Sequence, residues 1–144
     1  GRFTDDQRAI YQLVRDAQRT AEQVAVPGAS WSAPTDSARV TIARGLTRLG
    51  LVTGADSTYD CGAARPDGSF RQCPQWSLYY MHGLGHGIGF EVHDPEQGIG
   101  PGVLGEGSAF TLEPGVYVRE RLLDVIPDTP RNARLEAAIA PAVR

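Results

Sequence analysis

The sequence predicts an α+β domain, because segments with helical periodicity come first and short, β-prone apolar segments follow them. Residues 4–24 and 35–49 carry apolar side chains at helical spacing, whereas residues 76–94 and 109–118 are short and apolar. A chain of 144 residues, 41% of them hydrophobic, is long enough for one compact core and no more. We therefore expect a single domain over residues 1–144.

The first helix is predicted over residues 4–24. Thr4, followed three residues later by Gln7, forms a capping-box pattern, which marks a helix start. Pro27 and Gly28 then interrupt the helical pattern. The inward face is predicted to consist of Ile10, Val14, Ala17, Ala21 and Val24.

A second helix is predicted over residues 35–49, with Gly50 as a natural stop. The outer faces of both helices are polar, and we interpret them as solvated surface without a function. The inward residues of the second helix are predicted to be Ala38, Ile42, Leu46 and Leu49. The outward residues of the two helices are Arg15, Gln18 and Glu22, and Arg39, Arg44 and Arg48.

The remaining segments alternate between loop-forming and apolar composition. Residues 54–74 are rich in Gly, Asp, Ser and Pro and predict one long loop. The apolar segments 76–94 and 109–118 are expected to be strands of one sheet. A last helix is predicted to open at Thr129, with Pro130 in its first turn. Its inward residues are predicted to be Leu135, Ala138 and Ile139.

Charge and hydropathy exclude two classes of partner. The formal net charge is −3, from 14 basic and 17 acidic residues, so the chain lacks the basic footprint of a nucleic-acid-binding domain. No stretch approaches the roughly 18 consecutive apolar residues of a membrane span. Cys61 and Cys73 lie in the loop-forming segment and form either a disulfide or two reduced thiols, which leaves both a cytoplasmic and an exported location open.

All three histidines of the chain, His82, His86 and His93, fall within residues 82–93. Imidazole binds transition metals and moves protons near neutral pH. The four glycines among residues 82–89 make a helix there costly by roughly 1 kcal/mol each, and on a strand two residues four apart lie ~13 Å apart. We therefore expect at most one of His82 and His86 to bind a given metal ion, while the other serves the substrate or a proton.

Alternation along residues 109–118 places Thr111 and Glu113 on one face and the apolar Phe110 and Leu112 on the other. A carboxylate among apolar neighbours is costly to bury unless a cation compensates its charge. Glu113 is therefore a candidate metal ligand, with a surface glutamate on an edge strand as the alternative. A mixed set of imidazole and carboxylate ligands suits Mn, Co or Zn.

Three motifs occur together in this chain: MHGLGHGIG at residues 81–89, VHD at 92–94 and TLEPGVY at 111–117. They resemble the catalytic domain of Xaa-Pro aminopeptidases and prolidases, metallopeptidases that are related to methionine aminopeptidases and creatinases. The GRFT start and the Pro27-Gly28 pair are similar to the same family, so the resemblance covers nearly the whole chain. It implies the pita-bread fold, with helices packed on a curved, mainly antiparallel sheet.

The resemblance also implies a reaction and a set of site residues. The reaction would be hydrolysis of the peptide bond preceding proline, by a hydroxide shared between two divalent ions. His86 and Glu113 would be metal ligands, with Glu113 also acting as the base. His82 and His93 would be catalytic by contacting the substrate and stabilising the tetrahedral intermediate. The cofactors would be two Mn ions, with Co or Zn as alternatives, and the partner would be a proline-containing peptide.

The family pattern contains five metal ligands, of which this sequence shows two. We therefore expect the catalytic domain at residues 1–144 to be incomplete at both ends, to need the rest of its own domain for the site, and to be inactive alone. The alternatives are a metal-free creatinase-like hydrolase, a non-catalytic peptide-binding module of the same fold, and a glycine-rich strand whose histidines are ordinary core groups. The choice between aminopeptidase and dipeptidase, and the existence of a homodimer, stay open.

Overall fold

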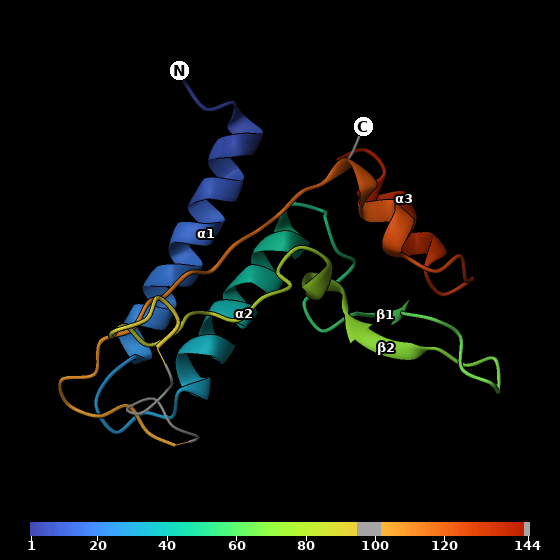
Figure 1. Ribbon diagram of the computed structural model, residues 1–144. Coiled ribbons are helices and arrows are strands. Elements are labelled where there is room, and N and C mark those ends of the chain that lie inside the picture. The colour runs from blue at the N-terminus through green and yellow to red at the C-terminus, as the bar shows by residue number, and fades with distance from the viewer. Residues whose placement is uncertain (95–101, 143–144) are drawn as a thin grey trace. The chain divides into compact units, whose positions relative to one another are not determined.

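The structure is a computed structural model that describes residues 1–94 and 102–142 (Figure 1). The chain divides into two compact units. Unit 1 consists of Gly1–Ile42 and His82–Val116, and unit 2 consists of Ala43–Met81 and Tyr117–Arg144. Helices carry most of the regular structure, and one two-stranded antiparallel sheet accompanies them. No helix in the described part of the chain is long and apolar enough to cross a membrane.

Helix α1 (Asp5–Val24) belongs to unit 1 and begins as the sequence predicts (Figure 1). The backbone N–H of Gln7 donates to Oγ1 of Thr4 over 3.2 Å, and the N–H of Thr4 donates to Oε1 of Gln7 over 3.0 Å, which confirms the capping box. Asp5 and Asp6 occupy the first turn, where their charge complements the helix dipole. The buried residues of α1 are Leu13, Ala17 and Ala21, two of which were predicted.

Helix α2 (Ser32–Arg48) starts three residues before the predicted position. Pro34 fits into the first turn, because the N–H that proline lacks has no partner there in any helix. Gly50 follows the helix with a φ of 72°, and its N–H donates to the carbonyl of Thr47 over 3.1 Å, which confirms the predicted stop. Leu49 lies beyond the last helical residue and is 41% exposed, contrary to prediction. Three residues predicted inward are buried: Ala38, Ile42 and Leu46.

The prediction of one long loop over residues 54–74 is wrong, because this segment contains a β-hairpin of unit 2. Strands β1 (Thr58–Cys61) and β2 (Arg71–Pro74) pair antiparallel. The glycine- and proline-rich composition belongs to the connection at residues 62–70. Strands of four residues are too short to show a clear alternation in the sequence, so they were not recognised.

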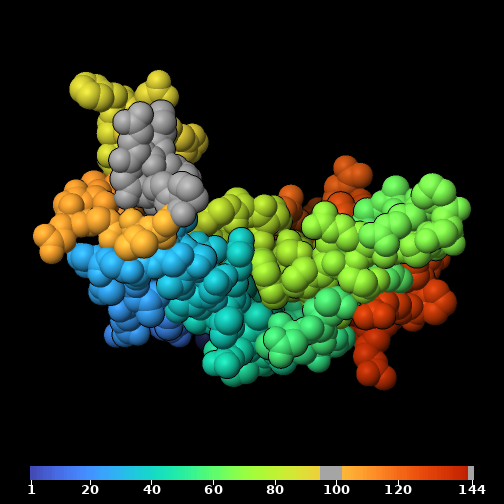
Figure 2. Space-filling view, turned by 90° about the horizontal axis from the view of Figure 1, so that it is seen from below, coloured from blue at the N-terminus to red at the C-terminus, as the bar shows by residue number. Residues whose placement is uncertain are grey.

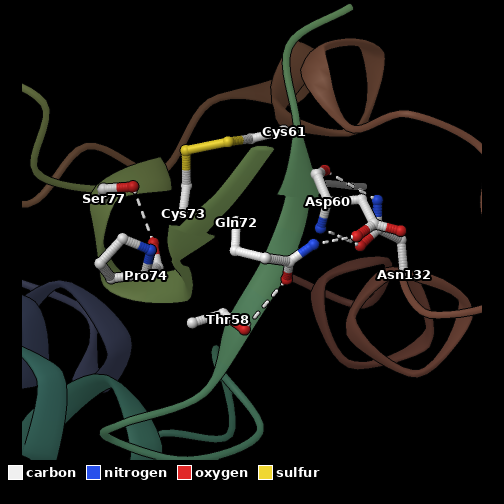
Figure 3. Close-up of a disulfide and its surroundings, with 8 residues drawn as sticks. All are labelled: Thr58, Asp60, Cys61, Gln72, Cys73, Pro74, Ser77 and Asn132. Atoms are coloured by element: carbon white, nitrogen blue, oxygen red, sulfur yellow. Dashed lines mark hydrogen bonds between the residues drawn. A yellow bond between two sulfur atoms is a disulfide. The ribbon is translucent and has the colours of Figure 1, made fainter. Parts of the chain in front are cut away.

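A disulfide between Cys61 and Cys73 joins the two strands, with 5.9 Å between the Cα atoms (Figure 3). Cys73 lies opposite Tyr59 and Cys61 lies opposite Arg71, so the two half-cystines are diagonal neighbours across the hairpin. Of the two alternatives that the sequence left open for this pair, the structure contains the bridge.

The buried amide of Asn132 contacts the main chain of β1 (Figure 3). Its Oδ1 accepts from the N–H of Asp60 over 2.9 Å, and its Nδ2 donates to the carbonyl of Asp60 over 3.0 Å. The Asp60 carboxylate accepts from Oγ1 of Thr129 over 2.7 Å and from the amide of Gln72. These hydrogen bonds, with that of Thr129 first, hold the pKa of the Asp60 carboxyl below its usual range.

Helix α3 (Ala133–Ile139) begins four residues after the predicted start at Thr129. Residues 129–132 form a turn instead, in which the N–H of Asn132 donates to the carbonyl of Thr129 over 3.0 Å. The predicted inward residues Leu135 and Ile139 are buried, and Ala138 is half-buried. The core of unit 2 contains Leu51, Val52, Tyr59, Leu78, Tyr79, Tyr80, Leu122, Ile126, Leu135 and Ile139.

The apolar segments 76–94 and 109–118 are not regular strands, contrary to prediction. The first opens within a 3-10 helix, η1 (Gln75–Leu78), and the second precedes another, η2 (Glu120–Val125). Isolated bridges take the place of a ladder among the described residues of both segments. The glycines of the first segment leave few side chains to pack on a sheet face, and Pro114 in the second lacks an N–H for pairing.

Removing the disulfide is expected to destabilise the protein. In the chain-entropy model, a bridge that closes a loop of this size contributes about 3 kcal/mol to the free energy of unfolding. A variant with Cys61→Ala and Cys73→Ala should therefore unfold at a lower urea concentration than the oxidised wild type. Dithiothreitol should lower the wild-type midpoint and leave that of the variant unchanged. Equal midpoints for the oxidised and reduced wild type would contradict this.

The lowered pKa of Asp60 predicts a pH-dependent contribution to stability. A carboxyl whose pKa is lower in the folded than in the unfolded state stabilises the fold fully above the unfolded value of about 3.9. This contribution is lost as the pH falls through the folded value. The stability difference between wild type and Asp60→Asn, as measured by urea unfolding, should therefore be largest near pH 7 and should shrink as the pH falls below about 4. A difference that stays constant with pH would contradict this assignment.

Candidate metal centre

Two segments of unit 1 run antiparallel and carry the residues that the sequence singled out. Three backbone hydrogen bonds join them. They run from the N–H of Glu113 to the carbonyl of Leu84 (2.6 Å), from Thr111 to His86 (2.8 Å) and from Ile88 to Ala109 (3.0 Å). This pairing brings His86 and Glu113 next to each other, although the segments are not regular strands.

Gly85 permits the close approach of these segments. A Cβ atom at position 85 would collide with the backbone carbonyl oxygen of Thr111. Gly83, two residues earlier on the same segment, has no heavy atom within 4 Å of such a Cβ. The absence of a side chain is thus required at Gly85 and not at Gly83, because the opposing backbone lies directly over Gly85.

The imidazole of His86 and the carboxylate of Glu113 face each other, with 3.2 Å between Nε2 and Oε1. The Nδ1 atom of His86 lies 2.9 Å from the carbonyl oxygen of Gly87. A carbonyl oxygen only accepts, so Nδ1 carries the hydrogen, and Nε2 of the neutral ring has a lone pair. Two atoms with lone pairs repel each other at this distance unless a proton or a metal ion lies between them.

This pair fits two ligands of one divalent ion. Nitrogen and oxygen ligands at ~2.1 Å from an ion lie roughly 3.0–3.4 Å apart at octahedral or tetrahedral angles. The observed 3.2 Å between Nε2 of His86 and Oε1 of Glu113 falls within that range. Over residues 1–94 and 102–142, no group of three or more His, Cys, Asp or Glu side chains is suited to hold a metal ion. The described residues therefore offer two donors here, and a complete site needs more.

His93 lies against His86. The ring centroids are 4.5 Å apart, and the ring planes meet at 88° in an edge-to-face arrangement. The segment returns toward His86 through a bridge between Gly87 and Asp94. A Cβ atom at Gly89 would meet the carboxylate of Asp94, so the Asp94 side chain lies directly against the backbone of Gly89.

The fourth predicted site residue, His82, is exposed, and its Nδ1 lies 2.7 Å from the carbonyl oxygen of Gly83. Within unit 1, His86 contacts both Glu113 and His93. His82 lies four residues before His86 on the same segment. The segment 88–94, drawn in yellow, projects from the surface of this unit (Figure 2). Large apolar side chains there are exposed, including Phe90 at 108% and Val92 at 79%.

Two polar residues that support the centre were not recognised from the sequence. The hydroxyl of Thr111 contacts the main chain of His86. Nε2 of Gln18, on α1, donates to the carbonyl of Leu112 over 3.0 Å, so the interpretation of Gln18 as solvated surface is wrong. A signal existed for each: Thr111 shares a face with Glu113 by alternation, and Gln18 continues the helical stripe of Val14 and Ala21.

Comparison with known proteins finds one matching family and several similar proteins. Residues 1–140 match the family model described as Metallopeptidase family M24. The chain is 35% identical over 126 residues to the Xaa-Pro aminopeptidase of Haemophilus influenzae, covering 83% of this chain and 26% of that protein. It is 33% identical over 149 residues to the Xaa-Pro dipeptidase of Rattus norvegicus, covering 92% of this chain and 28% of that protein.

A solved structure shares the fold. The structure of Pseudomonas aeruginosa aminopeptidase PepP matches with a TM-score of 0.63 and 27% sequence identity, covering 98% of this chain and 36% of that one. This match confirms the α+β class and the pita-bread architecture predicted from the sequence. The chain spans about a quarter of the length of the two relatives named above.

Substitution of Gly85 is expected to force the two segments apart. Gly85→Ala places a methyl group against the carbonyl of Thr111, and overpacking of this kind costs about 1–3 kcal/mol. Gly83→Ala, the matched control, meets open space and should leave stability within about 1 kcal/mol of wild type. Urea unfolding of both variants measures the difference. Equal stability of the two variants would contradict the close approach at Gly85.

Proposed function

This chain belongs to metallopeptidase family M24, and we propose that it forms part of the catalytic domain of a peptidase that hydrolyses the bond preceding proline. Two kinds of relative, an Xaa-Pro aminopeptidase and an Xaa-Pro dipeptidase, support this class of bond. The observation that carries the proposal is the 3.2 Å contact between Nε2 of His86 and Oε1 of Glu113. Such a mixed pair of donors suits a divalent metal ion.

In this proposal, His86 and Glu113 are two ligands of a centre that holds two divalent ions, most simply Mn, with Co or Zn as alternatives. A divalent ion polarises a carbonyl and lowers the pKa of a bound water, which are the two needs of peptide hydrolysis. The Nδ1–H of His86 donates to Gly87 and so directs Nε2 toward the centre. The remaining ligands are supplied by parts of the parent polypeptide outside these 144 residues.

The other predicted residues act on the substrate. Glu113 accepts a proton from the attacking water and returns it to the proline nitrogen as the carbon–nitrogen bond breaks. His93, whose ring lies edge-to-face with that of His86, is close enough to contact a substrate held at the centre. His82 and His93 donate hydrogen bonds to the substrate carbonyl oxygen and so stabilise the tetrahedral intermediate.

The alternative is a metal-free hydrolase like creatinase, or a non-catalytic peptide-binding module of the same fold. Neither needs an imidazole nitrogen and a carboxylate oxygen at a spacing that suits two ligands of one ion. Metal analysis distinguishes the proposals, because the alternatives require no bound ion. An active parent protein that contains no metal would favour the creatinase-like route.

The test uses the full-length parent protein. We expect it to bind about two divalent ions and to cleave Xaa-Pro peptides. Mutating a residue that only hydrogen-bonds to a metal ligand lowers activity by up to roughly 100-fold. Because His86 and Glu113 would bind the ions directly, His86→Ala and Glu113→Gln should each lower kcat/KM by more than that. Glu106→Gln, at an exposed glutamate of the same unit, is the matched control and should keep wild-type activity. Circular dichroism should show unchanged folding in all three variants.

Two results would count against this proposal. Full activity of Glu113→Gln would exclude Glu113 as both ligand and base. Robust turnover by the isolated 144 residues would show that the two donors suffice, contrary to the need for additional ligands.

A further inference from the structure

Thr111 holds both main-chain groups of His86. The N–H of His86 donates to Oγ1 of Thr111 over 3.0 Å. The carbonyl of His86 accepts from the N–H of Thr111 over 2.8 Å, and Oγ1 of Thr111 lies 3.5 Å from the same carbonyl. One residue therefore fixes the peptide groups on both sides of the His86 Cα atom.

The hydroxyl of Thr111 takes over a role that the backbone has in a regular sheet. Directly opposed residues in an antiparallel pair exchange two backbone hydrogen bonds. Here one bond is present, from Thr111 to His86, while the carbonyl of Thr111 lies over Gly85. The N–H of His86 would thus lack its strand partner, and Oγ1 of Thr111 accepts from it instead. The register at His86 therefore depends on a side chain.

We propose that Thr111 is a positioning residue that sets the direction of the His86 imidazole toward the metal centre. This inference rests on the function proposed above, in which His86 and Glu113 bind a divalent ion. The Thr111 contacts fix the main chain of His86, and the contact of its Nδ1 with the carbonyl of Gly87 then orients the ring from that position. Glu113 lies two residues from Thr111 on the same segment, and its N–H is bound to Leu84 over 2.6 Å. Thr111 thus attaches His86 to the segment that carries Glu113.

Thr111→Val tests this, because valine keeps the shape of threonine and removes the hydroxyl. In the full-length protein, we expect the affinity for Co²⁺, measured by competition with a chelator, to fall about 10- to 100-fold. The visible absorption spectrum of the Co²⁺-loaded protein should change, because one ligand is displaced. Thr111→Ser keeps a hydroxyl and should restore the affinity to within about threefold of wild type.

A matched control is available on α2. Thr41, also half-buried, donates from Oγ1 to the carbonyl of Ser37 over 3.0 Å and contacts Oγ1 of Thr20 over 2.9 Å. Thr41→Val loses a comparable set of hydroxyl contacts outside the centre and should keep the wild-type affinity and Co²⁺ spectrum. Comparing the unfolding midpoints of the metal-free variants separates a general loss of stability from a loss of ligand placement.

The outcomes distinguish this inference from the proposed function. If the wild-type protein binds no divalent ion, that result would contradict both the proposed function and this inference. Wild-type protein that binds ions, with a Thr111→Val variant of equal affinity and spectrum, would overturn the inference alone. A serine variant as weak as the valine variant would also overturn it, because the methyl group would then matter and the hydroxyl would not. If Thr111→Val does not fold, Thr111→Ala takes its place in the same comparison.

Discussion

The close antiparallel contact between residues 84–88 and 109–113 determines the geometry of the candidate centre. It exists because Gly85 has no side chain, which lets the carbonyl of Thr111 lie directly over it. The contact brings His86 and Glu113, which are distant in sequence, to 3.2 Å. The metal-binding proposal depends on this spacing, since a shift of either segment would separate the two donors.

Side-chain hydrogen bonds replace missing backbone partners at several points of both units. In unit 1, the hydroxyl of Thr111 accepts a hydrogen bond from the N–H of His86, and the amide of Gln18 donates one to the carbonyl of Leu112. In unit 2, the amide of Asn132 forms hydrogen bonds with both the backbone N–H and the backbone carbonyl of Asp60. Main-chain groups that leave water need partners, so a chain with little regular sheet must supply them from side chains.

The start of α1 and the end of α2 were predictable because their signals are local: the capping box at Thr4 and the stop at Gly50 each depend on a few neighbouring residues. The hairpin was not, since strands of four residues have too little pattern. Its disulfide was one of two alternatives that the sequence left open. That His86 and Glu113 lie at one centre was implied by the family resemblance of their motifs, while alternation indicated only the strand face of Glu113. The hydroxyl of Thr111 and the amide of Gln18 were not assigned roles, because their partners are backbone atoms brought close only by tertiary structure.

The amide of Asn132 limits how a strand of another protein molecule can pair with the edge of β1. An exposed strand edge offers free N–H and C=O groups, onto which a strand from another molecule can add. At Asp60, in the middle of β1, both groups are already engaged by Asn132, so an incoming strand finds no partner there. The same side chain that ties the turn before α3 to the hairpin thereby protects this edge against intermolecular strand addition and aggregation.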